Sequence, residues 1–451
     1  MSELSSRSPR LPLAARGSHA PACIRGLAAL SLLCLFAGPG MSQPLPASVV
    51  PQAPVGAATP TLGLPAVLQA ARDNIQVSIA RRLQAAARAD VLAADRAPTP
   101  VFSAKAGSID LNNGIGPGSP LGGKRIDKEL GFDWTLERGN KRALRVRSAE
   151  YVSEAAAWEA SEVALQQQLA AVQAFYELLS AQERITQLEA LERGASELST
   201  AAQRRQRAGD ISQQDAVRTD IEFQRAIAER LAAQAERERA SLALAQLSGL
   251  APPLAVRADW PQAGQADTLP SVNPDQRADV RAAQRKVEAA RVAVESAQAL
   301  RRNDVTVGTS LSHYPGTSRA LMEVRLAMPL AGILGNYGYE GEIARAHAQL
   351  AQAQDELDRT RRLAQGESAR LAQDLQAARA RAAAFEAEIV PRARRVADLA
   401  ELAYSRGALP LVDLIDARRT LRAVLLEQLA ARTDHARALA SWQLRASPAQ
   451  P

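Results

Sequence analysis

Large apolar residues recur at every seventh position in the stretch that begins at Leu144. The series is Leu144, Tyr151, Trp158, Leu165, Val172 and Leu179, with companions four residues on at Leu169 and Tyr176. This spacing is typical of a coiled coil. It predicts one helix from Lys141 to Ala208, about 68 residues and, at ~1.5 Å per residue, roughly 100 Å long. A helix of that length is expected to pack against other long helices.

The same order of elements is predicted twice. The first copy has a helix at Leu64–Asp95, strands at Val101–Leu111 and Leu130–Leu136 around a turn-rich loop at 112–123, the long helix, and a helix at Ser212–Leu247. The second copy has a helix from Asn273-Pro274 to Arg301, strands at Val305–Leu311 and Leu321–Met328, a long helix at Gly341–Arg406, and a helix at Pro410–Trp442. An offset of 198 relates Gly209 to Gly407 and Asp215 to Asp413. The chain is therefore predicted to contain a duplicated unit, with nearly aligned kink candidates at Gly194 and Pro391.

The predicted strands alternate between apolar and polar positions. Leu130, Phe132, Trp134 and Leu136 share one side of their strand, and Met322, Val324, Leu326 and Met328 share one side of another. Such alternation suits a barrel with lipid outside and water inside. Four strands cannot close a barrel, and open sheet edges are not tolerated in lipid. Three chains would supply twelve strands, whereas the alternative is an ordinary sheet packed on helices.

The predicted fold class is mainly α with a small β part. Long antiparallel coiled-coil helices form a duplicated unit, and its β-hairpins close a 12-stranded barrel in a trimer. The expected segments are a signal peptide at 1–42, a Pro-rich leader at 43–60, the first repeat at 61–250, a linker at 251–273, the second repeat at 274–445 and a tail at 446–451.

The N-terminal segment has the organisation of a signal peptide. Arg25 precedes an apolar run of about a dozen residues, and small residues follow it, with cleavage expected near 40–42. A short membrane anchor is the alternative. Both cysteines, Cys23 and Cys34, fall in this segment, so the mature chain is expected to have no thiol chemistry. Lipidation of Cys34 is a further alternative.

Composition excludes several classes of function. The formal charge of the 451-residue chain is +7, but no basic cluster is accompanied by stacking aromatics, so a nucleic-acid partner is not expected. The four histidines have no metal-ligand spacing, and no nucleotide-binding loop, serine-hydrolase motif or paired-cysteine motif is present. We expect no enzyme activity, no cofactor and no resident metal.

Two local segments carry a resemblance to a known family. One is Tyr404-Ser-Arg-Gly-Ala-Leu-Pro-Leu-Val-Asp-Leu-Ile-Asp416, with a weaker twin at Arg207–Arg218. The other is Leu136-Glu-Arg-Gly-Asn-Lys-Arg142, with a counterpart at Pro329–Gly332. Together with the element order over about residues 60–445, they resemble the TolC-like outer membrane factor family. The Gly-Asn-Lys-Arg stretch is similar to its heavy-metal cation efflux (CzcC-like) subclass.

The resemblance implies a homotrimer in the outer membrane of a Gram-negative cell that extends into the periplasm. It implies a passive duct for cations, heavy metals or small toxic compounds, docked to a periplasmic adaptor (membrane fusion) protein and an inner-membrane RND-type pump. Two other functions stay open. One is a type I protein-secretion conduit of the same fold, and the other is a periplasmic coiled-coil adaptor without a barrel.

The same resemblance assigns candidate site residues to the periplasmic tip. Asp413 and Asp416, three apart on one helix face, match constriction carboxylates, and Asp215 is their counterpart in the first repeat. Rings of such carboxylates favour cations, whereas the alternative for Asp215 and Asp413 is ordinary helix capping. Tyr404 matches a residue that holds the tip closed, but Leu409 stands where the family has a basic partner. Gly209 and Gly407 are expected to supply the left-handed residue that ends each long helix.

Overall fold

The computed structural model describes residues 61–109, 112, 116–117, 126–263, 273–315, 318–329 and 337–448. The predicted signal peptide, leader, both cysteines, most of the loop at 112–123 and the turn after Pro329 lie outside these residues. Within the described part, helices occupy most of the chain and strands a small share, as the sequence predicts.

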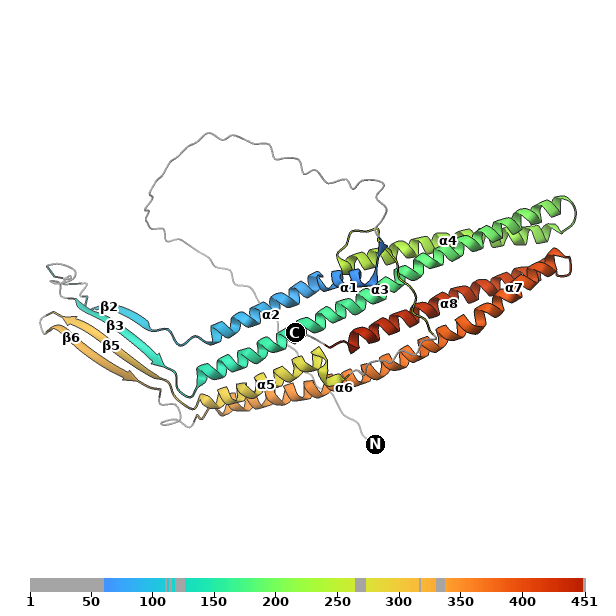
Figure 1. Ribbon diagram of the computed structural model, residues 1–451. Coiled ribbons are helices and arrows are strands. Elements are labelled where there is room, and N and C mark those ends of the chain that lie inside the picture. The colour runs from blue at the N-terminus through green and yellow to red at the C-terminus, as the bar shows by residue number, and fades with distance from the viewer. Residues whose placement is uncertain are drawn as a thin grey trace, which may run out of the picture. The chain divides into compact units, whose positions relative to one another are not determined.

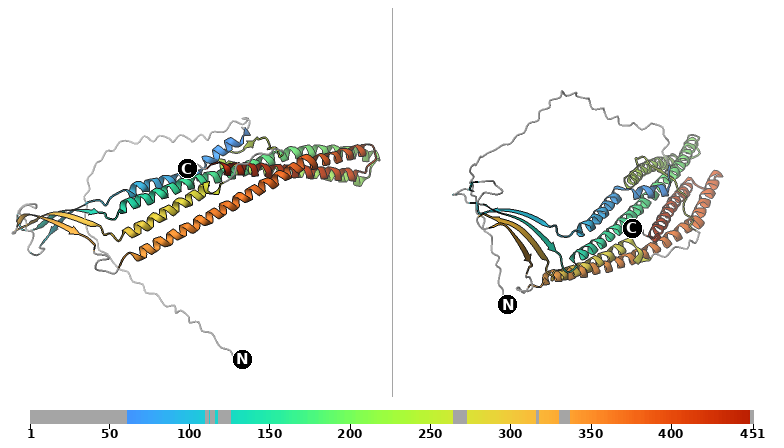
Figure 2. Two further views of the ribbon diagram at one scale, coloured as in Figure 1. Left: turned by 60° about the horizontal axis from the view of Figure 1, so that its bottom comes forward. Right: turned by 60° about the vertical axis from the view of Figure 1, so that its left-hand side comes forward.

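The helices form one layer in which each short pair lies beside a long helix (Figures 1 and 2). In the first repeat α3 (Lys141–Arg207) is flanked by α2 (Ile75–Ala94) and α4 (Gln213–Ser248). In the second repeat α5 (Ala278–Ala299) and α8 (Leu411–Ala446) lie between α3 and the long track of α6 (Glu340–Ala384) and α7 (Val390–Ser405). The layer therefore has α2 and α4 along one edge and α6 and α7 along the other.

Four antiparallel strands continue the helices at one end (Figure 1). They are β2 (Val101–Gly107), β3 (Asp127–Leu136), β5 (Val305–Tyr314) and β6 (Ser318–Ala327), in the spatial order β2-β3-β5-β6. The two hairpins, one from each repeat, pair with each other through β3 and β5, and Trp134 lies opposite Val307. Strands β2 and β6 are left as the two edges of the sheet.

The main apolar core lies where the two repeats meet near the middle of α3. Phe175, Leu178 and Leu244 are fully buried there and pack with α1 (Leu64–Arg72). A two-stranded parallel sheet, β1 (Thr61–Leu62) with β4 (Ala255–Val256), closes this region. Gln182 of α3 holds β4, because its side-chain amide donates to Val256 O (2.9 Å) and accepts from Val256 N (3.0 Å).

The predicted seven-residue series is confirmed as a packing seam at its ends. Leu144, Val172 and Leu179 are buried. Tyr151 and Trp158 are half-buried, and their rings lie under Arg285 and Arg281 of α5, at 6.0 and 4.8 Å from the guanidinium carbon. The middle of the seam therefore uses cation–π contacts.

Several predicted boundaries are wrong in detail. The helix expected at 64–95 is two helices, because Asn74 caps a new one by accepting from Gln76 N at 2.8 Å. The strand expected at 101–111 ends at Gly107. The long helix expected from Gly341 to Arg406 contains a π-helical turn, Phe385–Ile389, which ends two residues before Pro391, because proline lacks the N–H that a regular turn requires. Its counterpart Gly194 interrupts nothing, and α3 is continuous.

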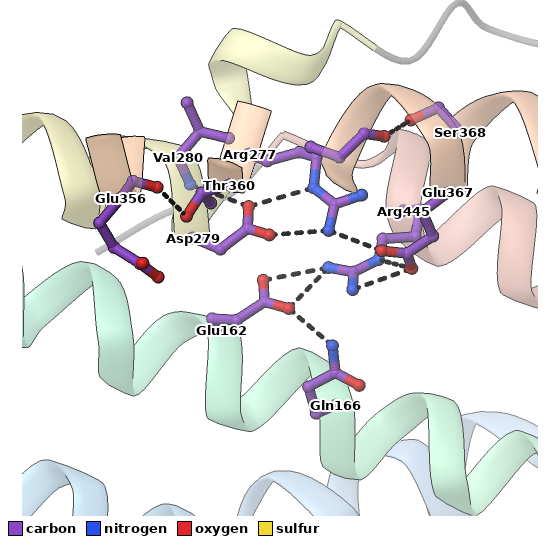
Figure 3. A network of polar contacts seen from close by, with 11 residues as sticks. Glu162, Gln166, Arg277, Asp279, Val280, Glu356, Thr360, Glu367, Ser368 and Arg445 are labelled. Carbon is purple, nitrogen blue, oxygen red and sulfur yellow. Dashed lines mark hydrogen bonds and ion pairs between the residues drawn. The ribbon is translucent and has the colours of Figure 1, made fainter. Parts of the chain in front are cut away.

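A buried ion network joins the end of α8 to the start of α5 (Figure 3). Arg445 contacts Glu162 of α3 at 2.8 Å and Glu367 of α6 at 3.1 Å. Arg277, the residue before α5, contacts Glu367 and Asp279, both at 2.8 Å. Both arginines are almost completely buried, so the network ties four helices together at the level where the short helices of the second repeat meet.

Candidate functional site at the helical tips

Two tight turns form the ends of the helical hairpins, one between α3 and α4 and one between α7 and α8 (Figure 1). Gly209 and Gly407 have φ of +85° and +75°, the left-handed conformation expected of them. Asp210 N donates to Arg205 O and Ala408 N to Ala403 O, both at 2.9 Å. The two turns thus close with the same hydrogen bond at the offset of 198.

Asp215 forms a capping interaction at the first turn of α4. Ser212 Oγ accepts from Asp215 N at 3.1 Å and donates to Asp215 Oδ2 at 2.8 Å. Arg218 approaches the same carboxylate at 3.9 Å. The capping alternative is therefore observed, since this carboxylate is engaged by its own helix.

Asp413 and Asp416 are arranged differently at the matching turn of α8. Both are exposed, and neither has a side-chain hydrogen bond or ion pair with any residue that the structure describes. Pro410 is the cap of this helix and offers no side-chain bond. The two carboxylates are thus exposed to solvent and ions, and the helix N-terminus favours the negative charge of Asp413 in the first turn.

Tyr404 has a basic partner that the sequence did not suggest. Arg205 Nη1 donates to the hydroxyl of Tyr404 at 3.2 Å, and the guanidinium carbon lies 5.5 Å from the ring centre. Tyr404 also packs against the buried cluster of Leu411, Leu414 and Ile415. Arg205 belongs to the other repeat, so only the folded arrangement brings it to Tyr404.

Three arginines of α8 link the two helical hairpins. Arg419 bonds Glu222 of α4, Arg422 lies 3.3 Å from Glu229 of α4, and Arg418 donates to the carbonyl of Gly194 in α3 at 3.1 Å. The hydrogen bond from Arg419 lowers the pKa of Glu222 despite partial burial, which favours the ion pair. A cavity of about 220 Å³ between the hairpins is lined by the three arginines together with Glu222 and Gly194. The only sequence signal that would have suggested these three arginines is their spacing of i, i+1 and i+4 on α8.

The sheet presents a row of apolar side chains to solvent. Leu130, Phe132 and Trp134 are about half exposed, and Met322, Val324 and Leu326 more so. On the alternate positions Asp133 is engaged by Arg325 at 2.6 Å, across β3, β5 and β6. The predicted alternation of the strands is therefore confirmed.

Within the described part of the chain, no three His, Cys, Asp or Glu side chains are placed to hold a metal ion.

Among the helices that the structure describes, none combines the length and the apolarity needed to cross a membrane.

The fold defines the class of similar proteins, the TolC-like outer-membrane channels, whose solved structures it resembles over most of the chain. In particular, the sequence is similar to the cobalt-zinc-cadmium resistance protein CzcC of Cupriavidus metallidurans. The two are 28% identical over 308 residues, which cover 63% of this chain and 69% of CzcC. The predicted resemblance to the CzcC-like subclass is thereby confirmed, although no family model matches.

Solved membrane proteins share the fold. CusC, described as forming a transmembrane channel, superposes with a TM-score of 0.71 over 85% of this chain and 91% of its own, at 14% identity. VceC of Vibrio cholerae gives 0.69 over 85% and 95%, at 19% identity. CmeC of Campylobacter jejuni, an outer membrane channel, gives 0.68 over 85% and 84%, at 14% identity.

Proposed function

We propose that three copies of this chain close a twelve-strand barrel in the outer membrane and form the exit duct of a tripartite efflux system. The observation that carries this proposal is the four-stranded sheet, which presents a row of apolar side chains to solvent. Its strands continue directly into helices that are too long to be buried in a globule. An apolar sheet face with unpaired edge strands suits lipid only when neighbouring copies pair those edges.

The edges of the helical layer support ring closure by the same copies. On one edge Ile75 of α2 and Leu231 of α4 are more than half exposed. On the other edge Leu363 of α6 and Leu399 of α7 are exposed to a similar degree. Because the two edges differ, pairing them head to tail generates a ring rather than a two-fold dimer.

We infer that the cargo is divalent metal cations or other small toxic compounds. The similar protein CzcC is a cobalt-zinc-cadmium resistance protein, and the free carboxylates Asp413 and Asp416 would form acidic rings at the tip of a trimer. Asp215 takes a capping role in this proposal, and the contact of Arg205 with Tyr404 would hold the tip closed. The periplasmic adaptor and the inner-membrane RND-type pump would supply the energy.

Fractionation and a susceptibility panel test this function. We expect unheated samples of outer membranes to contain a trimer that resists detergent, and a deletion strain to become sensitive to cobalt, zinc and cadmium. A water-soluble monomer would favour the coiled-coil adaptor. Sensitivity confined to dyes and antibiotics would move the cargo to organic compounds, and loss of a secreted protein would favour the secretion conduit.

A further inference from the structure

Four exposed arginines lie in the connections between helices and strands. They are Arg96 between α2 and β2, Arg138 between β3 and α3, and Arg301 and Arg302 between α5 and β5. These connections meet at the same end of the sheet (Figure 1). We call these four residues the arginine belt.

Hydrogen bonds hold the three connections in fixed positions. Asp304 Oδ1 accepts from the backbone N–H of Arg138 at 2.9 Å, which joins the β3–α3 connection to the α5–β5 connection. Arg145 Nη2 donates to the carbonyl of Arg96 at 3.1 Å, which brings in the α2–β2 connection. The belt is therefore built on a defined framework.

The carboxylates next to the belt already have other partners. Asp304 pairs with Lys141 at 2.8 Å, Asp95 with Arg142 at 3.0 Å, and Glu137 with Arg145 at 2.5 Å. By contrast, no carboxylate of the described residues lies within 4.0 Å of a guanidinium nitrogen of the belt. The four positive charges of the belt therefore have no ion-pair partner among the residues that the structure describes.

Aromatic and apolar side chains border the belt on the side of the sheet. Trp134, 51% exposed, and Leu136 stand at this end of β3. Tyr337 is exposed just before α6, and Arg301 Nε donates to the carbonyl of the next residue, Gly338, at 3.1 Å. Tryptophan and tyrosine concentrate where a membrane meets water.

We propose that the arginine belt binds the phosphate groups of anionic phospholipids in the periplasm-facing leaflet. This inference rests on the proposed function, because it requires the sheet to lie in the membrane. Guanidinium groups match phosphate oxygens in pairs, and their aliphatic stems lie along apolar surface while the charge reaches the head groups. Each basic residue near an anionic surface contributes about fivefold in affinity.

Quenching of Trp134 fluorescence by brominated lipids tests the proposal on the full-length assembly in vesicles. The signal of Trp134 is the difference between the wild type and Trp134→Phe. We expect brominated phosphatidylglycerol to quench this signal more strongly than brominated phosphatidylcholine, with a preference that weakens as salt rises. The variant with Arg96, Arg138, Arg301 and Arg302 all changed to Gln should lose most of the preference.

A matched control removes four exposed arginines that are remote from the sheet and unpaired among the described residues. Changing Arg204, Arg207, Arg394 and Arg395 to Gln should leave the lipid preference as in the wild type. Equal quenching by both lipids in the wild type, or an unchanged preference in the belt variant, would overturn the inference and point to a neighbouring copy that covers the belt. If neither lipid quenches Trp134, the sheet does not lie in the membrane and the proposed function itself fails.

Discussion

At the residue scale, corresponding positions of the two repeats have different roles. Asp215 and Asp413 are 198 positions apart and follow turns closed by the same hydrogen bond. Asp215 is engaged by Ser212 and Arg218, whereas the carboxylate of Asp413 has no partner among the described residues. The difference follows from the residue before each helix, because Ser212 offers a hydroxyl and Pro410 offers none. The carboxylate of Asp413 is therefore available to other partners.

Neutralising the free carboxylates should weaken the interaction of the channel with cations. We expect Asp413→Asn with Asp416→Asn to reduce block of single-channel current by divalent cations several-fold, because a ring of charge raises the local cation concentration. The matched control is Asp355→Asn with Asp358→Asn, an exposed pair with the same spacing on α6. Equal block in wild type and the tip variant would remove the selectivity role.

Two glycines should respond to alanine with opposite signs. Gly407→Ala should lower the free energy of unfolding by about 1–2 kcal/mol, because a side chain is strained at φ +75°. Gly366→Ala, in the interior of α6 with open space around it, should raise it by about 0.5–1 kcal/mol. Thermal or denaturant unfolding of the purified protein measures both, and the same sign for the two variants would contradict the conformational explanation.

At the scale of elements, the second repeat departs from the first where its long helix meets Pro391. The π-helical turn Phe385–Ile389 allows Val390 N to donate to Phe385 O, five residues earlier. The first repeat has Gly194 near this level, and α3 stays regular because glycine retains its N–H.

Each repeat also joins its short helices by different contacts. In the first repeat the side-chain amide of Asn74 donates to Leu247 O at 2.6 Å, and in the second repeat the ion network joins the short helices.

The ion network should make the stability of the junction between α5 and α8 depend on pH. Burial by itself would raise the pKa of Glu367, but the hydrogen bond from Arg277 and the charge of Arg445 outweigh it, so its pKa is lowered. A lowered pKa in the folded state stabilises the fold above the ordinary glutamate value of ~4.3, and this contribution is lost as pH falls through the lowered value.

Glu367→Gln should therefore destabilise the protein by about 1–3 kcal/mol at neutral pH, because it leaves buried arginines short of charge. The difference from wild type should shrink as pH falls below about 4. Melting temperatures measured across this range give the comparison. Glu356→Gln, whose exposed carboxylate lies 3.8 Å from Arg359, is the control and should have almost no effect. A constant difference at every pH would show that charge is not the cause.

At the scale of the whole molecule, the described chain has two unlike apolar edges. This arrangement is expected of a subunit whose neighbours complete it, since exposed apolar rows along packed helices mark interaction surfaces. Strand β2 lies on the same side as α2, and strand β6 lies on the same side as α6 (Figure 1). One ring of copies would therefore pair the edges of the sheet and the edges of the helical layer together.

A charge placed on one edge should oppose assembly. We expect Ile75→Glu, at the exposed start of α2, to reduce the trimeric fraction about tenfold or more, because an unpaired carboxylate would be buried between subunits. Gln298→Glu, exposed on α5 within the layer, adds the same charge away from the edges and should leave the trimer unchanged. Electrophoresis of unheated detergent extracts measures the fraction, and equal loss in both variants would argue against an interface at this edge.

The sequence by itself determined the elements, because helix period, strand alternation and turn glycines are local properties of the chain. The seven-residue series, the 198-residue offset and the left-handed Gly209 and Gly407 follow from spacing and backbone conformation alone. Only the tertiary structure decided which side chains meet. Arg205 with Tyr404, Arg419 with Glu222, and the network around Glu367 join residues of different helices, and no local pattern fixes the relative rotation of packed helices. The order β2-β3-β5-β6 was decided in the same way, by contacts between segments far apart in the chain.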